Sequence, residues 1–288
     1  MFEIQKLTKG TQNYPVKLTH LAKPPDQLST LGVSLSRQLK NPVLAVVGSR
    51  KASSYGRGVT EDLTSSAARA GICIVSGLAL GIDSIAHNAS LAASGKTIAV
   101  LPSGLGNIYP ASHRALAKRI LQNNGTLISE YPDDFMPRRE SFIQRNRIIA
   151  GLSDALLVTE AAERSGSLYT ARFALEIGKP VLAVPGNINS PTSAGTNNLI
   201  KSGAIAVTSE QDIFNALDIK QKDKNEEKVF GDNENETTLI KLLAGGVANG
   251  HELLEQSSLA VETFQQTLTI LEIKGVVTPL GNNNWKLR

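Results

Sequence analysis

Cysteine, long apolar runs and paired histidines are scarce in this sequence, and each scarcity excludes a class of protein. Cys73 is the single cysteine among 288 residues, which excludes an internal disulfide framework and a cysteine-rich zinc site. The four histidines are scattered and form no H-x3-H pair, so no metal site is predicted. No apolar run approaches the roughly 18 residues of a membrane span, and residues 1–30 lack the apolar stretch of a signal peptide. We therefore expect a cytoplasmic protein without metal or membrane contact.

The charge is unevenly distributed along the chain. Residues 1–217 hold 22 Lys and Arg against 15 Asp and Glu, a net charge of +7, whereas residues 218–288 hold 8 against 11, a net charge of −3. A positive field attracts polyanions, so we expect a polyanionic partner to bind the N-terminal part. A solvated basic surface is the alternative, and charge alone does not choose between the two.

Short apolar segments alternate with longer amphipathic ones between residues 41 and 207. The apolar segments have the length and β-branching of buried strands. Strands are predicted at 43–47, 72–75, 97–101, 125–129, 155–158, 180–185 and 205–207, and helices at 58–70, 83–93, 112–122 and 167–177. Residues 141–153 are predicted to be a loop that enters a helix, and a further helix is predicted to start at 197–201. Strands that are apolar throughout are typical of a parallel sheet covered on both faces. Residues 41–217 are therefore predicted to form an α/β domain with a doubly wound, mostly parallel sheet.

The segments that flank this domain have other patterns. Residues 1–40 carry turn signals and weak helical patterning, so we expect an N-terminal extension packed on the sheet domain. Residues 218–236 are rich in charge and asparagine, which is typical of a linker. Residues 237–288 then predict helices at 238–243, 251–256 and 260–274 and a hairpin with Gly281-Asn282 at its tip. Three helices followed by a hairpin indicate a small C-terminal winged-helix domain.

Glycine-rich loops follow the first three predicted strands. The carboxyl ends of parallel strands lie at one edge of the sheet, where ligands bind. Glycine lets the backbone approach a ligand, and an arginine there can hold a phosphate bidentately. None of the loops matches GxGxxG or GxxxxGK[ST], so a generic dinucleotide or triphosphate site is not supported. The candidate ligand residues are Gly48, Ser49 and Arg50 after the first strand, Ser76, Gly77 and Gly81 after the second, and Gly104 after the third.

Arginines are densest in residues 136–150, MPRRESFIQRNRIIA. The segment has one acidic residue, and its candidates for nucleic-acid contact are Arg138, Arg139, Phe142, Arg145, Asn146 and Arg147. Arginines neutralise backbone phosphates, and an aromatic ring stacks a base with about 1–3 kcal/mol. The alternative is a solvated helix face with Phe142 in the core.

A further candidate lies where the predicted helix 167–177 begins. Ser165, Gly166 and Ser167 can present N–H and hydroxyl donors to a phosphate there. Glu160 upstream could accept from a ligand or pair with an arginine, and His87 is expected to be packed. No thiol at a loop, carboxylate pair or serine–histidine set with obvious catalytic roles emerges, which favours a binding protein over an enzyme.

The series of motifs resembles a known family. The segments GSR (48–50), SGLALGIDSIAH (76–87), LPSGLGNIYP (101–110), SEYP (129–132), FIQRNRIIAGLSD (142–154), ERSGSLYTARFALEIGKPVLAVPG (163–186) and GTNNLIKSGA (195–204) resemble the DNA-processing protein A (DprA/Smf) family. The resemblance covers residues 14–215 in order. It implies an extended Rossmann-like fold that binds single-stranded DNA without sequence preference. It also implies a homodimer formed through this domain, protection of incoming DNA, and loading of RecA during natural transformation (competence) and recombination.

The resemblance also implies roles for individual residues. The GSR arginine and the aromatic RNR motif correspond here to Arg50, Phe142, Arg145 and Arg147. A basic residue that the family often carries a few positions before the aromatic corresponds to Arg138 or Arg139, and both remain open. The winged-helix tail is near-neutral and therefore a poor phosphate binder, so a protein contact or a role independent of duplex DNA is predicted for it. No cofactor is expected.

Two alternative functions use the same kind of sheet. A LOG-type nucleoside monophosphate phosphoribohydrolase carries PGGxGTxxE, but Thr170 stands here where that motif has its glutamate. A small-nucleotide sensor would use the same phosphate loops, and its affinity for oligonucleotides would not grow with their length. The DNA-binding interpretation requires Arg50 and Phe142 to line one cleft.

Overall fold

The computed structural model describes residues 3–219, 231–281 and 283–287 and divides into two compact units. The first unit comprises residues 3–219, and the second comprises the described residues from 231 onward. Residues 220–230 of the predicted linker, and Asn282 at the predicted hairpin tip, lie outside the described residues. Within the described part of the chain, no helix is both long and apolar enough to cross a membrane.

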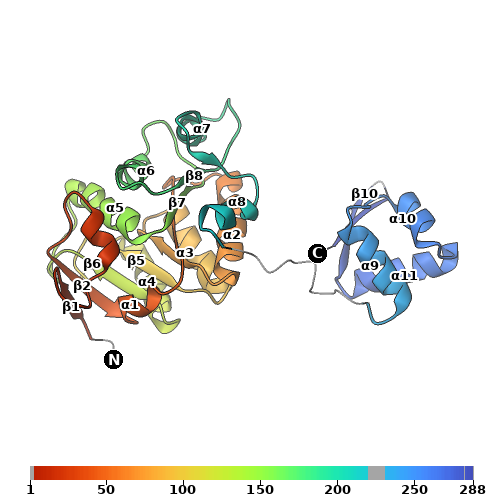
Figure 1. Ribbon diagram of the computed structural model, residues 1–288, viewed down its shortest axis with the longest axis horizontal. Coiled ribbons are helices and arrows are strands. Elements are labelled where there is room, and N and C mark those ends of the chain that lie inside the picture. The colour runs from red at the N-terminus through yellow and green to blue at the C-terminus, as the bar shows by residue number, and fades with distance from the viewer. Residues whose placement is uncertain (1–2, 220–230, 282, 288) are drawn as a thin grey trace. The chain divides into compact units, whose positions relative to one another are not determined.

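The first unit is built on a nine-stranded sheet with the order β1-β2-β6-β5-β4-β3-β7-β8-β9 (Figure 1). Its strands are β1 (Gln5–Thr8), β2 (Gln27–Gly32), β3 (Val43–Val47), β4 (Cys73–Ser76), β5 (Thr97–Val100), β6 (Thr126–Ser129), β7 (Ala155–Val158), β8 (Val181–Ala183) and β9 (Ile205–Ala206). In this order, every neighbouring pair from β6 through β3 to β9 is parallel. β2 pairs antiparallel with β6, and β1 pairs antiparallel with β2. The predicted α/β class with an extended Rossmann-like, mostly parallel sheet is confirmed.

Helices cover both faces of this sheet. They are η1 (Val16–His20), α1 (Leu35–Gln38), α2 (Ser54–Arg69), α3 (Ile82–Ala92), η2 (Ala111–His113), α4 (Arg114–Gln122), α5 (Arg139–Leu152), α6 (Ser167–Glu176), α7 (Ala194–Lys201) and α8 (Glu210–Ala216). Alternate residues of a strand point to opposite faces, so Val43, Ala45 and Val47 pack with α5 and α6, whereas Leu44 and Val46 pack with α2, α3 and α8. The predicted double winding follows from this alternation.

The N-terminal segment differs from its weak helical pattern. Residues 5–8 and 27–32 are strands that extend the sheet, with β2 pairing antiparallel to β6 and β1 pairing to β2. The helical interpretation was wrong for these two stretches, because β2 pairs with a strand about 100 residues away and β1 pairs with β2. Lengthening a loop adds little to its entropic cost, so such distant pairing is permitted. Leu28 in β2 is fully buried, so the segment shares the core of the first unit.

The strand order sets where a ligand can bind. β3 lies between β4 and β7, and the chain runs outward from β3 to β6 on one side before it returns to β7 on the other. The connection after β3 leads to α2 on one face, and the connection after β7 leads to α6 on the other. A crevice opens at such a switch point, outside the carboxyl ends of the strands. The loops at 48–53 and 159–166 therefore border the expected site.

The second unit contains three helices followed by an antiparallel hairpin. These elements are α9 (Glu234–Ala244), α10 (Gly250–Ser257), α11 (Val261–Ile273), β10 (Val277–Gly281) and β11 (Asn284–Leu287). α9 begins inside the predicted linker, because Asn233 accepts a hydrogen bond from the Glu236 amide at 2.9 Å and caps the helix. The order of elements is that of the predicted winged helix, an assignment that stays a prediction.

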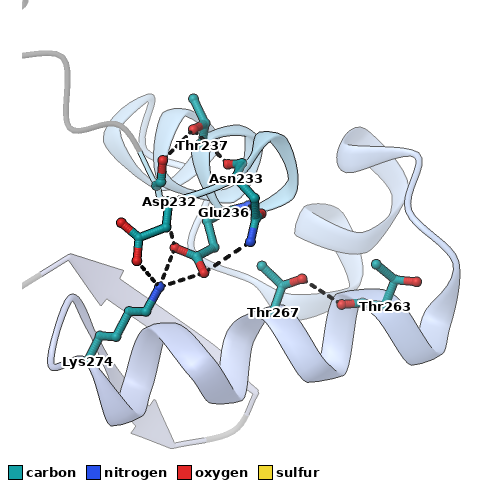
Figure 2. Close-up of polar contacts among 8 residues, drawn as sticks. Asp232, Asn233, Glu236, Thr237, Thr263, Thr267 and Lys274 are labelled. Carbon is teal, nitrogen blue, oxygen red and sulfur yellow. Dashed lines mark hydrogen bonds and ion pairs between the residues drawn. The ribbon is translucent and has the colours of Figure 1, made fainter.

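A lysine joins the two ends of this unit's helical part (Figure 2). Lys274 Nζ lies 2.7 Å from Asp232 Oδ2 and 2.7 and 2.9 Å from the two carboxylate oxygens of Glu236. Hydrogen bonds from the ammonium group lower the pKa of both carboxyl groups. The start of α9 is thus held to the end of α11, and both acidic groups are occupied by the lysine.

Candidate functional site

A cleft of about 800 Å³ opens at the carboxyl ends of β3 and β7. It is lined by the loop after β3, the first half of α5, the start of α6 and single residues from neighbouring loops. Ten of the predicted ligand residues line it, namely Gly48, Ser49, Arg50, Arg139, Phe142, Arg145, Asn146, Ser165, Gly166 and Ser167. The cleft therefore lies at the switch point of the sheet. It brings together the loop after β3, the arginine-rich start of α5 and the serine-rich start of α6.

The loop after β3 is held in place by its backbone. Ser49 donates its amide to Glu160 O at 2.8 Å and accepts from the Ile82 amide at 3.1 Å. A Cβ on Gly48 would lie 2.6 Å from Ile82 Cγ1, so only glycine lets the loop pass this close to α3. These contacts place Arg50 at the mouth of the cleft with an exposed side chain.

An arginine and two aromatic rings form one wall of the cleft. The Arg50 Cζ atom lies 5.0 Å from the centroid of the Phe142 ring. Tyr109 meets Phe142 edge to face, with centroids 5.5 Å apart and ring planes at 76°. No hydrogen bond or ion pair occupies Arg50 within the described residues. A cation above a ring face keeps its N–H donors free, so this guanidinium is available to a phosphate.

Arg145 occupies the floor of the cleft as a buried cation. It is 3% exposed and donates from Nη1 to the carbonyl oxygens of Gly77 and Val100. Asp83 accepts from the amides of Gly77 at 3.1 Å and Ala79 at 3.4 Å. Burial lowers the pKa of Arg145 to about 10 and raises the pKa of Asp83. Arg145 thus positions the loop after β4, and its guanidinium is already occupied.

The start of α6 supplies uncharged hydrogen-bond donors to the same cleft. The hydroxyl oxygens of Ser165 and Ser167 lie 2.8 Å apart, and Asn146 Nδ2 donates to Gly166 O at 3.3 Å. The Gly166 amide has no partner among the described residues. A helix N-terminus with a free amide and two hydroxyl groups favours an anion.

An aromatic stack outside the cleft distinguishes Arg138 from Arg139. Phe135 stacks on Tyr131 with centroids 4.3 Å apart, and Arg138 Cζ lies over the Phe135 ring, 5.8 Å from its centroid. Arg139 is the first residue of α5 and lines the cleft. The geometry therefore favours Arg139 as the ligand residue and gives Arg138 a packing role.

Two further predicted residues point away from the cleft. Arg147 is 8% exposed and forms an ion pair with Glu130, which follows β6. Ser76 is fully buried and donates its hydroxyl to Val46 O at 2.6 Å. Sequence reasoning grouped both with the ligand residues because they adjoin motif positions, but their polar groups serve the fold.

The remaining glycines permit close packing between loops. A Cβ on Gly77 would lie 2.3 Å from Arg145 Nη1, although Gly77 also lines a cavity of about 60 Å³ that adjoins Arg50. Gly81 has a φ of +77°, and a Cβ there would lie 2.2 Å from Ser49 O. A Cβ on Gly104 would lie 2.0 Å from the carbonyl oxygen of Pro132. These glycines shape the sheet edge and do not line the main cleft.

Two polar residues that sequence reasoning left open have structural partners. Glu160 accepts from the Ser53 amide at 3.2 Å and from the Ser53 hydroxyl, so it holds the start of α2 and serves neither a ligand nor an arginine. His87 is fully buried, with Nδ1 2.7 Å from Thr97 Oγ1, and burial lowers its pKa to about 3. The predicted packed state of His87 is confirmed.

Several cleft residues were not among the predicted ligand residues, namely Lys51, Tyr109, Ile143, Tyr169, Thr170 and Thr192. Of these, Thr170 was considered only as the position of the hydrolase glutamate. Lys51 adjoins Arg50, and Tyr109 follows the third glycine-rich loop, so position alone could have suggested both. Tyr169 is 48% exposed two residues after Ser167, a signal of the same kind. Thr192 lies in a loop with no motif, and only the fold brings it to the cleft.

Comparison with known proteins agrees with this geometry. The family model for DNA recombination-mediator protein A matches residues 5–218. Protein Smf of Escherichia coli strain K12 is 51% identical over 174 residues, which are 60% of this chain and 46% of the relative. DNA processing protein DprA of Bacillus subtilis strain 168 is 40% identical over 214 residues, 74% of this chain and 71% of the relative. The chain thus spans less than half the length of the E. coli relative.

Solved structures extend the likeness to three dimensions. DNA processing protein A of Streptococcus pneumoniae aligns with a TM-score of 0.69 and 39% identity over 74% of each chain. DNA processing protein A of Helicobacter pylori, whose structure describes a single-stranded DNA binding mode, aligns with a TM-score of 0.67 and 35% identity over 75% of this chain and 96% of that one. The model match spans nearly the whole first unit, and the chain belongs to the DNA recombination-mediator protein A family.

Proposed function

We propose that the first unit binds single-stranded DNA in this cleft without sequence preference. The observation that carries the proposal is the Arg50 guanidinium above the Phe142 ring, with its donors unpaired and the start of α6 across the cleft. Aromatic rings beside a positively charged groove are how proteins hold single strands, because every base has a stacking face. The H. pylori relative, which is described as binding single-stranded DNA, supports this assignment.

The cations and the aromatic rings of the cleft would contact different parts of the strand. Arg50, Lys51 and Arg139 are exposed cations at the cleft and would neutralise phosphates. Phe142 and Tyr109 would stack bases, whose faces are accessible only when the strand is unpaired. None of these contacts reads the edge of a base, so sequence preference is expected to be weak.

The cleft is better suited to binding than to catalysis. Asp83 is the one carboxylate among the residues that line it, and its oxygen accepts two backbone amides. Thr170, which stands where the hydrolase motif has its glutamate, is 1% exposed and carries no carboxylate. We therefore prefer a binding protein to the phosphoribohydrolase alternative.

Family membership supports a wider role for the bound strand. We propose that the protein forms a homodimer through the Rossmann-like domain, protects incoming single-stranded DNA and loads RecA onto it during natural transformation and recombination. The second unit, whose acidic groups hold its lysine, is proposed to contact protein rather than DNA.

A titration with labelled oligonucleotides tests the DNA-binding proposal. Fluorescence anisotropy would compare a single strand with its duplex at about 50 and 200 mM salt, and oligo-dT of about 4 to 16 nucleotides with dTMP. We expect preference for the single strand, affinity that falls with salt, and affinity that grows with length. Equal affinity for the duplex would refute the proposal, and affinity that is independent of length would favour the mononucleotide sensor.

A further inference from the structure

A second cavity, which we name the Tyr55 cavity, adjoins the cleft. Its volume is about 510 Å³, within the roughly 300–1,000 Å³ of small-molecule sites. Its polar lining comes from Ser53, Tyr55, Asn187, Ser190, Thr192 and Ser193. Thr192 also lines the cleft, so the two hollows are contiguous along one surface. A chain that leaves the cleft past Thr192 would enter the Tyr55 cavity.

Two helices begin at the Tyr55 cavity. Ser53 is the N-cap of the 16-residue helix α2, and Ser193 is the N-cap of the eight-residue helix α7. The start of α2 is already occupied, because the Ser53 hydroxyl accepts from the Gly56 amide at 3.0 Å and the Glu160 carboxylate accepts from Ser53. The start of α7 has no side-chain cap, and its partial positive charge favours a negatively charged group. The residues that line the cavity include no acidic side chain.

A hydroxyl without a protein partner lies at the same place. Ser193 is 5% exposed, lines the cavity, and its hydroxyl makes no hydrogen bond with any described residue. A Cβ on Gly186 would lie 2.2 Å from Ser193 Oγ, so the glycine leaves this hydroxyl its space. The hydroxyl is therefore available to a ligand that enters the cavity.

An aromatic ring forms a fixed wall of the Tyr55 cavity. Tyr55 is 52% exposed, and its hydroxyl donates to Pro185 O at 2.8 Å. The Asn197 side chain holds the adjoining loop, accepting from the Gly186 amide at 3.2 Å and donating to the Gly186 carbonyl at 3.1 Å. The ring makes no aromatic contact within the described residues, so a face is available to a base.

We propose that the Tyr55 cavity holds one further nucleotide of the strand that occupies the cleft. Its phosphate would lie at the N-terminus of α7 beside Ser193, and its base would stack on Tyr55. The hydroxyl and amide groups of Ser190 and Asn187 would meet the edge of the base. The inference rests on the proposed function and extends the bound strand past Thr192 to a second stacking site.

The test is the dependence of Tyr55→Ala on oligonucleotide length. Oligo-dT that fills only the cleft should bind the variant as it binds the wild type, whereas oligo-dT that reaches the Tyr55 cavity should bind about tenfold more weakly. Tyr55→Phe keeps the ring and removes the hydroxyl, so it should bind all lengths like the wild type. Unchanged affinity of Tyr55→Ala at every length, or an equal loss at every length, would overturn the inference.

Photocrosslinking of the wild-type protein provides a second readout that does not depend on how the variants fold. A 5-iodouracil moved along the oligonucleotide should crosslink to Tyr55 from a position several nucleotides away from the one that crosslinks to Phe142. The absence of a Tyr55 crosslink, with Phe142 crosslinked, would overturn the inference and leave the proposed function intact. Absence of all crosslinks, with no effect of Arg50→Ala on binding, would instead refute the proposed function.

A free mononucleotide carries the same base and phosphate as a nucleotide of the strand and could occupy the Tyr55 cavity instead. Calorimetric titration with dTMP should detect no Tyr55-dependent binding at concentrations where the long oligonucleotide saturates, because the strand supplies the nucleotide at a high effective concentration. Tyr55-dependent dTMP binding together with an unchanged oligonucleotide length profile would overturn the inference in favour of a separate mononucleotide site.

Discussion

Two cations, one in each unit of this chain, have opposite surroundings. In the first unit, Arg50 lies over the Phe142 ring and meets no carboxylate within the described residues. In the second unit, Lys274 lies between two carboxylates, Asp232 and Glu236, within hydrogen-bond distance of both. An ion-paired ammonium offers little to a phosphate, whereas a guanidinium on a ring keeps its donors. The partner of a cation, more than the net charge of its unit, decides whether it can bind DNA.

The same distinction divides the arginines of the first unit. Arg145 and Arg147 are buried and occupied by carbonyl oxygens and by Glu130, whereas Arg50 and Arg139 are exposed at the cleft. Buried charges that are paired resist removal, since the loss of one partner leaves the other unpaired. The comparison therefore separates residues that hold the fold from residues that hold a ligand.

The largest effect is expected from Arg145→Met. The change leaves the Asp83 carboxyl and two buried carbonyl groups without their cation, so the free energy of unfolding of the first unit should fall by about 3–5 kcal/mol. Urea unfolding followed by far-UV circular dichroism would measure it. Trp285, the single tryptophan, reports on the second unit, and its transition should not move.

Arg139→Met is the matched control for this change. Arg139 is exposed and makes no ion pair within residues 3–219, so its loss should alter the free energy of unfolding by no more than about 0.5 kcal/mol. A similar loss of stability in the two variants would contradict the division between buried and exposed arginines.

The next largest effect is expected on single-strand binding by Phe142 and Arg50. Phe142→Ala removes a stacking face and should weaken binding to a single strand by about 1–3 kcal/mol without altering the salt dependence. Arg50→Ala removes one phosphate contact, so it should weaken binding and also lower the slope of log K against log salt by roughly 0.7. Anisotropy titrations at several salt concentrations separate the two. Identical salt slopes for both variants would show that Arg50 does not contact a phosphate.

The free energy of unfolding of the two units should respond to acid over different pH ranges. The pKa of buried His87 is lowered to about 3, so between about pH 6.5 and 3 the unfolded chain takes up a proton that the folded chain does not. The free energy of unfolding of the first unit should therefore fall with pH, by about 1–2 kcal/mol between pH 7 and 5. The pKa values of Asp232 and Glu236 are lowered by Lys274, so their stabilisation is lost only below about pH 4.

Unfolding at several pH values would measure this difference. Circular dichroism follows the helices of both units and Trp285 fluorescence follows the second alone, so the transition seen only by circular dichroism belongs to the first unit. His87→Gln should flatten the dependence of the first unit between about pH 6.5 and 5. Equal loss of stability in both units over that interval would show that His87 is not the cause.

The smallest effect is expected from removal of residues 219–288. The second unit's Lys274 is neutralised, so affinity for a single strand should change by about twofold or less, under 0.5 kcal/mol. The same anisotropy titration measures it, with Arg50→Ala as the positive control. A tenfold loss would show that the second unit contributes to DNA binding and would end the contrast between the units.

Much of the fold and part of the site could be predicted because their signals are local. The parallel strands are apolar along their whole length, and Gly48, Arg50 and Phe142 lie in motifs that follow strands or open helices. β1 and β2 could not be found this way, since β2 is stabilised by pairing with β6 and β1 by pairing with β2, rather than by their own patterns. Thr192 was missed for the same reason, because nothing near it in the sequence marks a ligand.

The arginines of α5 show what the local sequence pattern cannot predict. Arg139, Phe142 and Asn146 are three and seven residues apart, which places them on one side of α5, whereas Arg145 and Arg147 lie about 100° to either side of Asn146. Helical spacing can group these residues, but it cannot say which group faces the ligand. The contacts of α5 with Gly77, Val100 and Glu130 show which of these arginines have partners within the fold.

The order of residues thus specifies the alternation of strands and helices and the chemistry at the sheet edge, because backbone propensity and apolar period act over a few neighbouring positions. It does not specify which cations stay free, which loops meet at Thr192, or that the N-termini of α2 and α7 converge on Ser193. Those features depend on the strand order, which joins segments more than 100 residues apart and leaves some charges buried with partners and others facing water.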